Sequence, residues 1–258
     1  MSGATTKIKI VVPLITLAVW QVLCSAGILP AAKIPSPAAI VLAGTELIAA
    51  GLPPGNTMLL HCAYSLLRVV SGFALAAAAG IPLGIAMGRY RMLRTAITPI
   101  VETIRPIPPL AWIPLAILWF GIGLSSATFI IFLGCLFPIL LSTVSGVLSV
   151  EPVLVDAAKT LGARDRDIFL KVLLPGAFPS ICTGLRIGLG IGWMTLVAAE
   201  FTGVKSGYGL GYMIMTARDI QRPDMVIAGM AAIGIVGLAL DGCLRIAESR
   251  LLSWRSVA

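Results

Sequence analysis

The sequence offers few side chains that could carry catalysis or bind a metal. It holds one histidine, His61, and five cysteines that stand apart from one another without a CxxC pair. A zinc site needs about four such ligands, and an active site needs a cluster of carboxylates, His or Cys. We therefore expect no metal centre and a structural or surface role for His61. The cysteines are expected to behave as small hydrophobic residues.

Charged residues inside the apolar stretches are the remaining candidates for chemistry. Arg186 could lower the electrostatic barrier for an anion crossing a membrane, although its long stem favours a structural role such as bonding carbonyl groups. Glu102 and Arg105 are three residues apart, a spacing that predicts a local ion pair on a continuous helix. Glu200 is expected either to be paired or to contact a docked partner. These four residues and Trp193 are our candidates for a pathway.

Composition indicates what kind of elements position these residues. Of the 258 residues 58% are hydrophobic and only 12% are charged, and the mean hydropathy is +1.01. Such a chain fits a bilayer, where a helix of about 20 apolar residues satisfies its own backbone hydrogen bonds. The net charge of +8 does not indicate nucleic-acid binding, because the cations cluster in short segments between apolar runs.

Six apolar runs predict six transmembrane helices and an all-α integral membrane protein. The first run exceeds the usual apolar region of a secretory signal, about 7–15 residues, so we expect it to be retained. The predicted spans are residues 10–29, 69–87, 96–120, 127–148, 181–201 and 225–246.

The distribution of cations predicts that both termini are cytoplasmic. With that orientation the inner segments hold twelve lysines and arginines, among them Lys7, Arg89, Lys159 and Arg245, and the outer segments hold five.

Proline and glycine divide the chain further. Prolines in 30–66 predict an external loop with a short helix near 40–50. We divide the chain into residues 1–55, a five-helix core of 56–250, and a cytoplasmic tail of 251–258. Four prolines between 106 and 114 predict a kink or late start in the third span, which either borders a pathway or is a kinked packing helix. Gly184, Gly188 and Gly192 predict a helix face that another helix approaches closely.

The polar segment 151–175 is predicted to form two short helices before the fifth span. Leu154, Ala157, Ala158 and Leu161 form an apolar stripe, and Gly162 suits the end of a helix. The second piece extends from about Arg164 to Leu173 and should end at Pro175. Such a pair either docks into a groove on a soluble partner or lies on lipid headgroups.

This segment resembles the EAA loop of importer-type ABC permeases, with Asp156-Ala157-Ala158 in place of Glu-Ala-Ala, followed by Gly162 and Leu174-Pro175. Residues 65–73 and 105–115 and the run from Trp193 to Glu200 are similar to the nitrate/sulfonate/taurine branch. The resemblance implies a type I importer permease with a MetI-like fold. It also implies a cytoplasmic coupling helix, to which Asp156, Ala157, Ala158, Leu161, Gly162, Phe169 and Pro175 are assigned.

The resemblance implies partners that supply what the chain lacks. No G-x-x-x-x-G-K-[ST] loop occurs, so ATP and Mg are expected on a separate ATPase subunit, and the chain itself is expected not to be an enzyme. Two permease copies, two ATPase subunits and an external solute-binding protein would form the importer in a bacterial inner membrane. The solute is open among nitrate, sulfonates, taurine and related small organic acids.

Two other classes are weighed against this interpretation. A secondary transporter driven by an ion gradient would need carboxylates or discontinuous helices at mid-membrane, where acids are nearly absent. A membrane enzyme would need a cluster of catalytic groups, which the sequence does not provide. An ABC permease for a different small organic solute is a further alternative.

Overall fold

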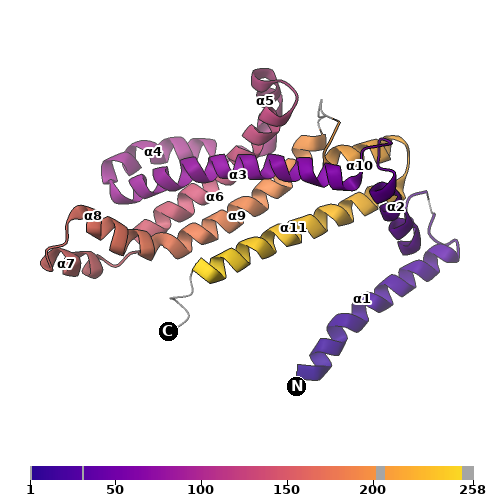
Figure 1. The fold of residues 1–258 in the computed structure, drawn as a ribbon, viewed down its shortest axis with the longest axis horizontal. Coiled ribbons are helices and arrows are strands. Elements are labelled where there is room, and N and C mark those ends of the chain that lie inside the picture. Colours follow the sequence, from indigo (N-terminus) through magenta and orange to yellow (C-terminus); the bar gives the residue numbers. More distant parts are fainter. Residues whose placement is uncertain (1, 31, 202–206, 252–258) are drawn as a thin grey trace. The chain divides into compact units, whose positions relative to one another are not determined.

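The computed structural model describes residues 2–30, 32–201 and 207–251, and every regular element in these ranges is a helix (Figure 1). The all-α prediction is confirmed. The elements are α1 (Ser2–Ser25), α2 (Pro37–Ala49), α3 (Met58–Arg89), α4 (Arg91–Ile104), the 3₁₀ turn η1 (Pro109–Trp112), α5 (Ile113–Phe120), α6 (Leu124–Leu148), α7 (Pro152–Thr160), α8 (Asp165–Ile168), the π-helical turn η2 (Phe169–Leu173), α9 (Leu174–Phe201), α10 (Leu210–Asp219) and α11 (Pro223–Leu251).

The described residues form two compact units. One comprises residues of 1–64 and 207–236, and the other comprises residues of 65–206 and 237–258. The boundaries predicted at residues 55 and 250 stay predictions, and nearly all of the predicted tail 251–258 lies outside the described residues.

Four helices in the described ranges are long and apolar enough to cross a membrane: α3, α6, the helix that ends in α9, and α11. The pair formed by α4 and η1–α5 gives a fifth span if it is counted as one broken span. The described apolar part of α1, Val11–Ser25, is shorter than these. The structure therefore supports four or five spans, and the sixth predicted span stays a prediction.

Several helices have bounds that differ from those of the predicted apolar spans, for local reasons. Helix α3 begins eleven residues before the predicted start at Val69. Its first turns carry polar side chains such as His61 and Arg68, which make the hydropathy of these turns too low for the predicted apolar run to include them. Helix α1 ends at Ser25, before the predicted residue 29. Gly27 follows with φ +72°, and the Ile28 N–H donates to the Leu23 carbonyl, which is the usual geometry of a glycine helix end.

The predicted break in the third span is confirmed. Helix α4 ends at Ile104, and the two arms meet at an angle of 82°. Pro106 and Pro108 lie in the break. Pro109 and Pro114 lie in the first turns of η1 and α5, where a backbone N–H would have no partner within the helix, so that its absence in proline costs nothing.

Pro175 does not end the second short helix, contrary to the prediction. Residues Asp165–Phe201 are continuously helical, with Pro175 at the second position of α9. The π-helical turn η2 directly precedes it. A wider turn relieves the clash between a proline ring and the carbonyl four residues earlier, so α8 is joined rigidly to α9.

Helix α6 is the centre of the larger unit, because glycines on two neighbours let their backbones approach it. Twelve of its 25 residues are buried. A Cβ at Gly184 would lie 2.6 Å from Ser142 Cβ, and one at Gly192 would lie 2.5 Å from Cys135 Sγ. The predicted close approach at this face of α9 is confirmed, and its partner is α6. Helix α3 meets α6 in the same way through Gly72, Gly80, Gly84 and Gly88.

Candidate functional site

Helix α7 presents apolar side chains without packing them. None of its nine residues is buried. Leu154, in the first turn, is 52% exposed, and Leu161, which directly follows the helix, is 87% exposed. Glu151 precedes the helix and Pro152 opens it, while Gly162 follows with φ +77°, which ends the helix as predicted. Of the predicted stripe, Ala157 is also exposed and Ala158 is half-buried.

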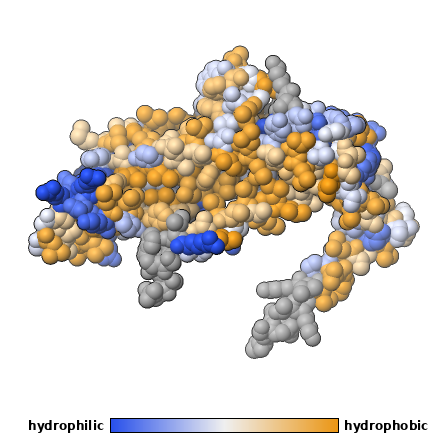
Figure 2. Space-filling model, viewed as in Figure 1, coloured by the Kyte–Doolittle hydropathy of each residue, from blue (hydrophilic) through white to orange (hydrophobic). Residues whose placement is uncertain are grey.

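The segment is anchored by α8 rather than by α7. Ile168 is 2% exposed, and Asp165 approaches the end of α3 through an ion pair with Arg89 at 3.5 Å. Phe169 is half-buried in η2, whereas Pro175 is exposed. Helices α7 and α8 lie at one end of the α6–α9 pair (Figure 1), and hydrophilic residues gather on the surface there (Figure 2).

Helix α7 is connected to a helical segment that continues into the apolar helices. Helices α8, η2 and α9 form that one continuous segment, and the turn at Gly162 joins it to α7. An exposed apolar stripe on an otherwise polar hairpin is typical of a docking surface.

Arg186 is paired with an acid. Its Nη1 lies 3.1 Å from Glu248 Oε2 of α11, and the two side chains are 40% and 23% exposed. Trp193, two turns further along α9, is buried against Gly237. A Cβ added at Gly237 would lie 2.8 Å from the indole Nε1 of Trp193. Both residues border a cavity of about 200 Å³ between α9 and α11. The ion pair supports a structural role for Arg186.

Glu200 is also paired. Its Oε1 accepts hydrogen bonds from Arg68 Nη1 at 2.5 Å and from the Ser65 hydroxyl at 2.8 Å. All three residues are 1% exposed or less, so the charges neutralise each other in a buried site. The expected pairing of Glu200 is therefore present, with a partner 132 positions earlier in the chain.

Glu102 and Arg105 do not form the ion pair that their spacing predicts. Helix α4 ends between them at Ile104, both side chains are exposed, and no ion pair within 4.0 Å joins them. Arg105 instead borders a cavity of about 300 Å³ together with residues of α6 and α9. The proline break therefore separates the pair, because the face of a continuous helix no longer exists there.

His61 has the structural role that the sequence favours. Its Nδ1 accepts the Gly209 N–H at 2.9 Å, so its Nε2 carries the proton and donates to the Leu52 carbonyl at 3.0 Å. The ring is fully buried and lies near Tyr208 and Tyr212. Within the described ranges no group of three or more His, Cys, Asp or Glu could hold a metal ion.

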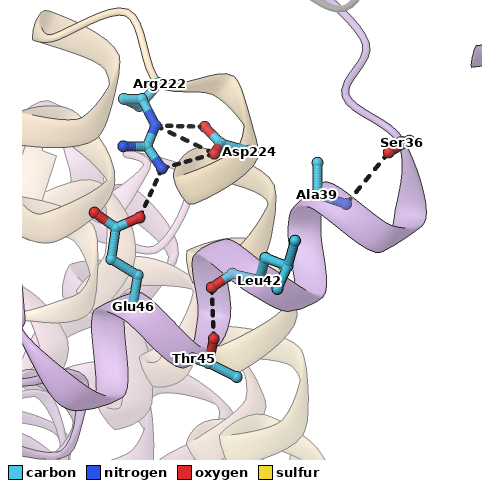
Figure 3. A network of polar contacts seen from close by, with 7 residues as sticks. All are labelled: Ser36, Ala39, Leu42, Thr45, Glu46, Arg222 and Asp224. Atoms are coloured by element: carbon cyan, nitrogen blue, oxygen red, sulfur yellow. Dashed lines mark hydrogen bonds and ion pairs between the residues drawn. The ribbon is translucent and has the colours of Figure 1, made fainter.

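A further charged network ties α2 to the start of α11 (Figure 3). The Arg222 guanidinium donates to both carboxylate oxygens of Asp224 and to Glu46 Oε2 at 2.9 Å. The hydrogen bonds to Asp224 and Glu46 raise the pKa of Arg222 above its usual value. Helix α2 begins at a Ser36 cap, whose hydroxyl accepts the Ala39 N–H at 3.2 Å.

Sequence reasoning missed the partners in these networks. Ser65, Arg68, Glu46 and Glu248 were not singled out, because each meets its partner from a distant part of the chain. The glycines of α3 recur at spacing four between Gly80 and Gly88, a pattern that could have been found.

Comparison with known proteins defines the class of this fold. A chain from the inward-facing structure of the MetNI methionine ABC transporter aligns with 78% of this chain and 96% of its own length. The TM-score is 0.62 and the sequence identity is 21%. This chain therefore shares the MetI-like fold.

The family follows from the sequence. A family model described as binding-protein-dependent transport system inner membrane component matches residues 80–253, more than half of the chain. The chain therefore belongs to this family and is the permease subunit of an ATP-binding-cassette importer, an inner membrane component that works with a solute-binding protein and an ATPase.

Two relatives place it in the nitrate, sulfonate and taurine branch. The chain is 40% identical over 243 residues to the taurine transport system permease protein TauC of Escherichia coli, covering 93% of this chain and 86% of TauC. It is 34% identical over 241 residues to the nitrate import permease protein NrtB of Synechocystis, covering 91% and 85%.

Proposed function

We propose that this permease imports a small anionic solute of the nitrate, sulfonate or taurine class. Support comes from the names of two relatives, a taurine transport permease and a nitrate import permease. Taurine has a tetrahedral sulfonate group, and nitrate is a planar oxyanion. In the proposed topology α1 crosses the membrane as well, which brings the number of spans to six. Both termini are cytoplasmic in this topology, on the side that holds the excess of cations. Of these cations, Arg255 lies outside the described residues, as does Lys205 of the opposite side.

Helix α7 is proposed to be the coupling helix. It would dock through Leu154, Ala157 and Leu161 into a cleft of a separate ATP-binding subunit, which would hold ATP and Mg. The observation that carries this proposal is an apolar stripe in which Leu154, Ala157 and Leu161 are exposed, on a hairpin whose second helix is continuous with α9. Closure of the ATPase around α7 would then move α9 as a lever.

The complete importer is proposed to hold two copies of this permease, two ATP-binding subunits and one external solute-binding protein. Gly184, Gly188 and Gly192 are already packed on α6 of the same chain, so the interface between copies must use other surfaces. Solute specificity would be imposed mainly by the binding protein, and the permease would provide the pathway.

The alternative of an ion-coupled secondary transporter is less well supported. Such a carrier needs a carboxylate that gains and loses an ion at mid-membrane. Glu200 and Glu248, both on long apolar helices or at their ends, are neutralised by arginines of neighbouring helices.

Uptake by cells that express the importer tests the proposed function. Permease, ATPase and binding protein are expressed together, and import of labelled nitrate and taurine is measured with and without Leu161→Glu in α7. Because Leu161 is 87% exposed, the variant should fold, yet lose co-purification with the ATPase and lose uptake. Arg166→Gln on α8 is the control for a changed charge on the same hairpin. Retained uptake in Leu161→Glu would contradict the docking model, and import of neither anion by the wild type would contradict the solute class.

A further inference from the structure

Three arginines lie within the apolar helical part of the larger unit, and two of them have an acid partner. Arg68 is paired with Glu200, and Arg186 is paired with Glu248. Arg105 has no carboxylate within 4.0 Å among the described residues. An unneutralised cation between membrane helices is costly, and such residues mark ion pathways.

The location of Arg105 distinguishes it further. It follows the last residue of α4 at the 82° break, and its side chain is exposed there. It borders a cavity of about 300 Å³, and the other lining residues, from the break, α6 and α9, are all apolar. Irregular backbone at membrane depth is tolerated where it lines a cavity or is covered by protein.

The cavity has the chemistry of a small-anion site. Ligand sites are mostly apolar with a few placed polar groups, and a volume of about 300 Å³ is at the small end of their range. A guanidinium offers a planar fork of donors that matches oxyanions, and apolar walls weaken the screening of its charge. Gly134 on α6 helps to keep the cavity open, because it places no side chain at the wall.

We propose that Arg105 forms an anion-binding subsite of the translocation pathway, in the cavity between the α4–η1 break, α6 and α9. The subsite takes a small solute with an oxyanion group, such as nitrate or the sulfonate end of taurine. It deepens the proposed function, on which it rests. Arg105 contacts the solute, whereas Arg68 and Arg186 hold helices together.

The first experiment reports on the cavity without depending on the transported solute. Ile107→Cys, a lining position, is introduced into the assembled transporter in a Cys243→Ala background, which removes an exposed native thiol. Reaction rates are compared for an anionic and a cationic methanethiosulfonate reagent. Arg105→Gln should lower the anionic-to-cationic rate ratio by at least about threefold, because one unit charge is removed nearby. Nitrate should slow the reaction in the presence of Arg105, and urea, a neutral planar molecule of similar size, should not.

The second experiment measures transport by permease, ATPase and binding protein in liposomes. Arg105→Gln should reduce uptake of nitrate and taurine by about tenfold or more, the value of one charge-assisted contact, and Arg105→Lys should retain most of it. ATPase stimulation by the loaded binding protein should persist in both variants.

Three results would overturn the subsite: an unchanged reagent ratio in Arg105→Gln, joint loss of uptake and ATPase stimulation, or equal loss of uptake in Glu102→Gln. The last would indicate an ion pair between permease copies. If the wild type imports neither anion, the proposed solute class fails, while the reagent ratio and the protection by nitrate still decide whether Arg105 binds anions.

Discussion

Helices α6 and α7 differ in how they use their apolar residues. In α6 nearly half of the residues are buried, and glycines of α3 and α9 bring two backbones against it. In α7 no residue is buried, although Val153, Leu154 and Leu161 are apolar. Packing within the chain therefore accounts for the apolar pattern of α6, whereas that of α7 is available for a partner. Substitutions around α6 should change stability, and substitutions on α7 should change coupling.

The largest loss of stability is expected where a charge is stranded next to this packed core. Glu200→Ala leaves Arg68 buried without its carboxylate, which should cost about 3–5 kcal/mol. The yield of folded protein and its melting temperature in detergent measure the effect. A melting temperature close to that of the wild type would show that the pair is not structurally important.

The next largest effect tests the contact between α9 and α6. Gly184→Ala places a Cβ within 2.6 Å of Ser142 Cβ, so the helices must separate, at about 1–3 kcal/mol. Gly190→Ala is the matched control on the same helix, because nothing lies within 4 Å of its added Cβ. Its stability should be equal to or above that of the wild type. Equal melting temperatures for both variants would contradict the close packing.

A smaller effect is expected at the partly exposed ion pair between α9 and α11. Arg186→Met or Glu248→Gln should change stability by about 0–1 kcal/mol, because solvent and side-chain entropy offset most of the attraction. Uptake and ATPase coupling should be retained in Arg186→Met. A loss of uptake with intact assembly would return Arg186 to the pathway.

The smallest effect on stability is expected on α7. Leu161→Glu should shift stability by less than about 0.5 kcal/mol, because the side chain is 87% exposed, yet it should abolish co-purification of the ATPase. A large drop in melting temperature would indicate that Leu161 packs within the permease, and would remove the contrast with α6.

The sequence predicts the parts of this fold that depend on local pattern. Hydropathy locates the long apolar helices α3, α6, α9 and α11. The prolines predict the bend after Ile104, and Gly162 predicts the end of α7, because each of these features depends on neighbouring residues. The continuation of the helix through Pro175 could not be predicted, since a π-helical turn relieves a clash that proline usually causes.

Pairings between distant residues are the part that the sequence does not reveal. Arg68 with Glu200 and Arg186 with Glu248 require two helices to be placed side by side. The absence of the ion pair expected between Glu102 and Arg105 has a local cause instead. Their spacing is correct for a continuous helix, but the helix ends between them.

The central claim is that α7 docks a separate ATPase, and thiol protection at Leu161→Cys tests it most directly. The purified permease in nanodiscs is labelled with a water-soluble maleimide in a Cys243→Ala background, with and without the ATP-binding subunit. Met92→Cys on α4, where the native side chain is 88% exposed, is the control. The account predicts rapid labelling of residue 161 in the permease alone, strong protection by the ATPase, and unchanged labelling of residue 92. Slow labelling of residue 161 in nanodiscs that the ATPase does not alter would show instead that α7 lies on the lipid surface, and would contradict the account.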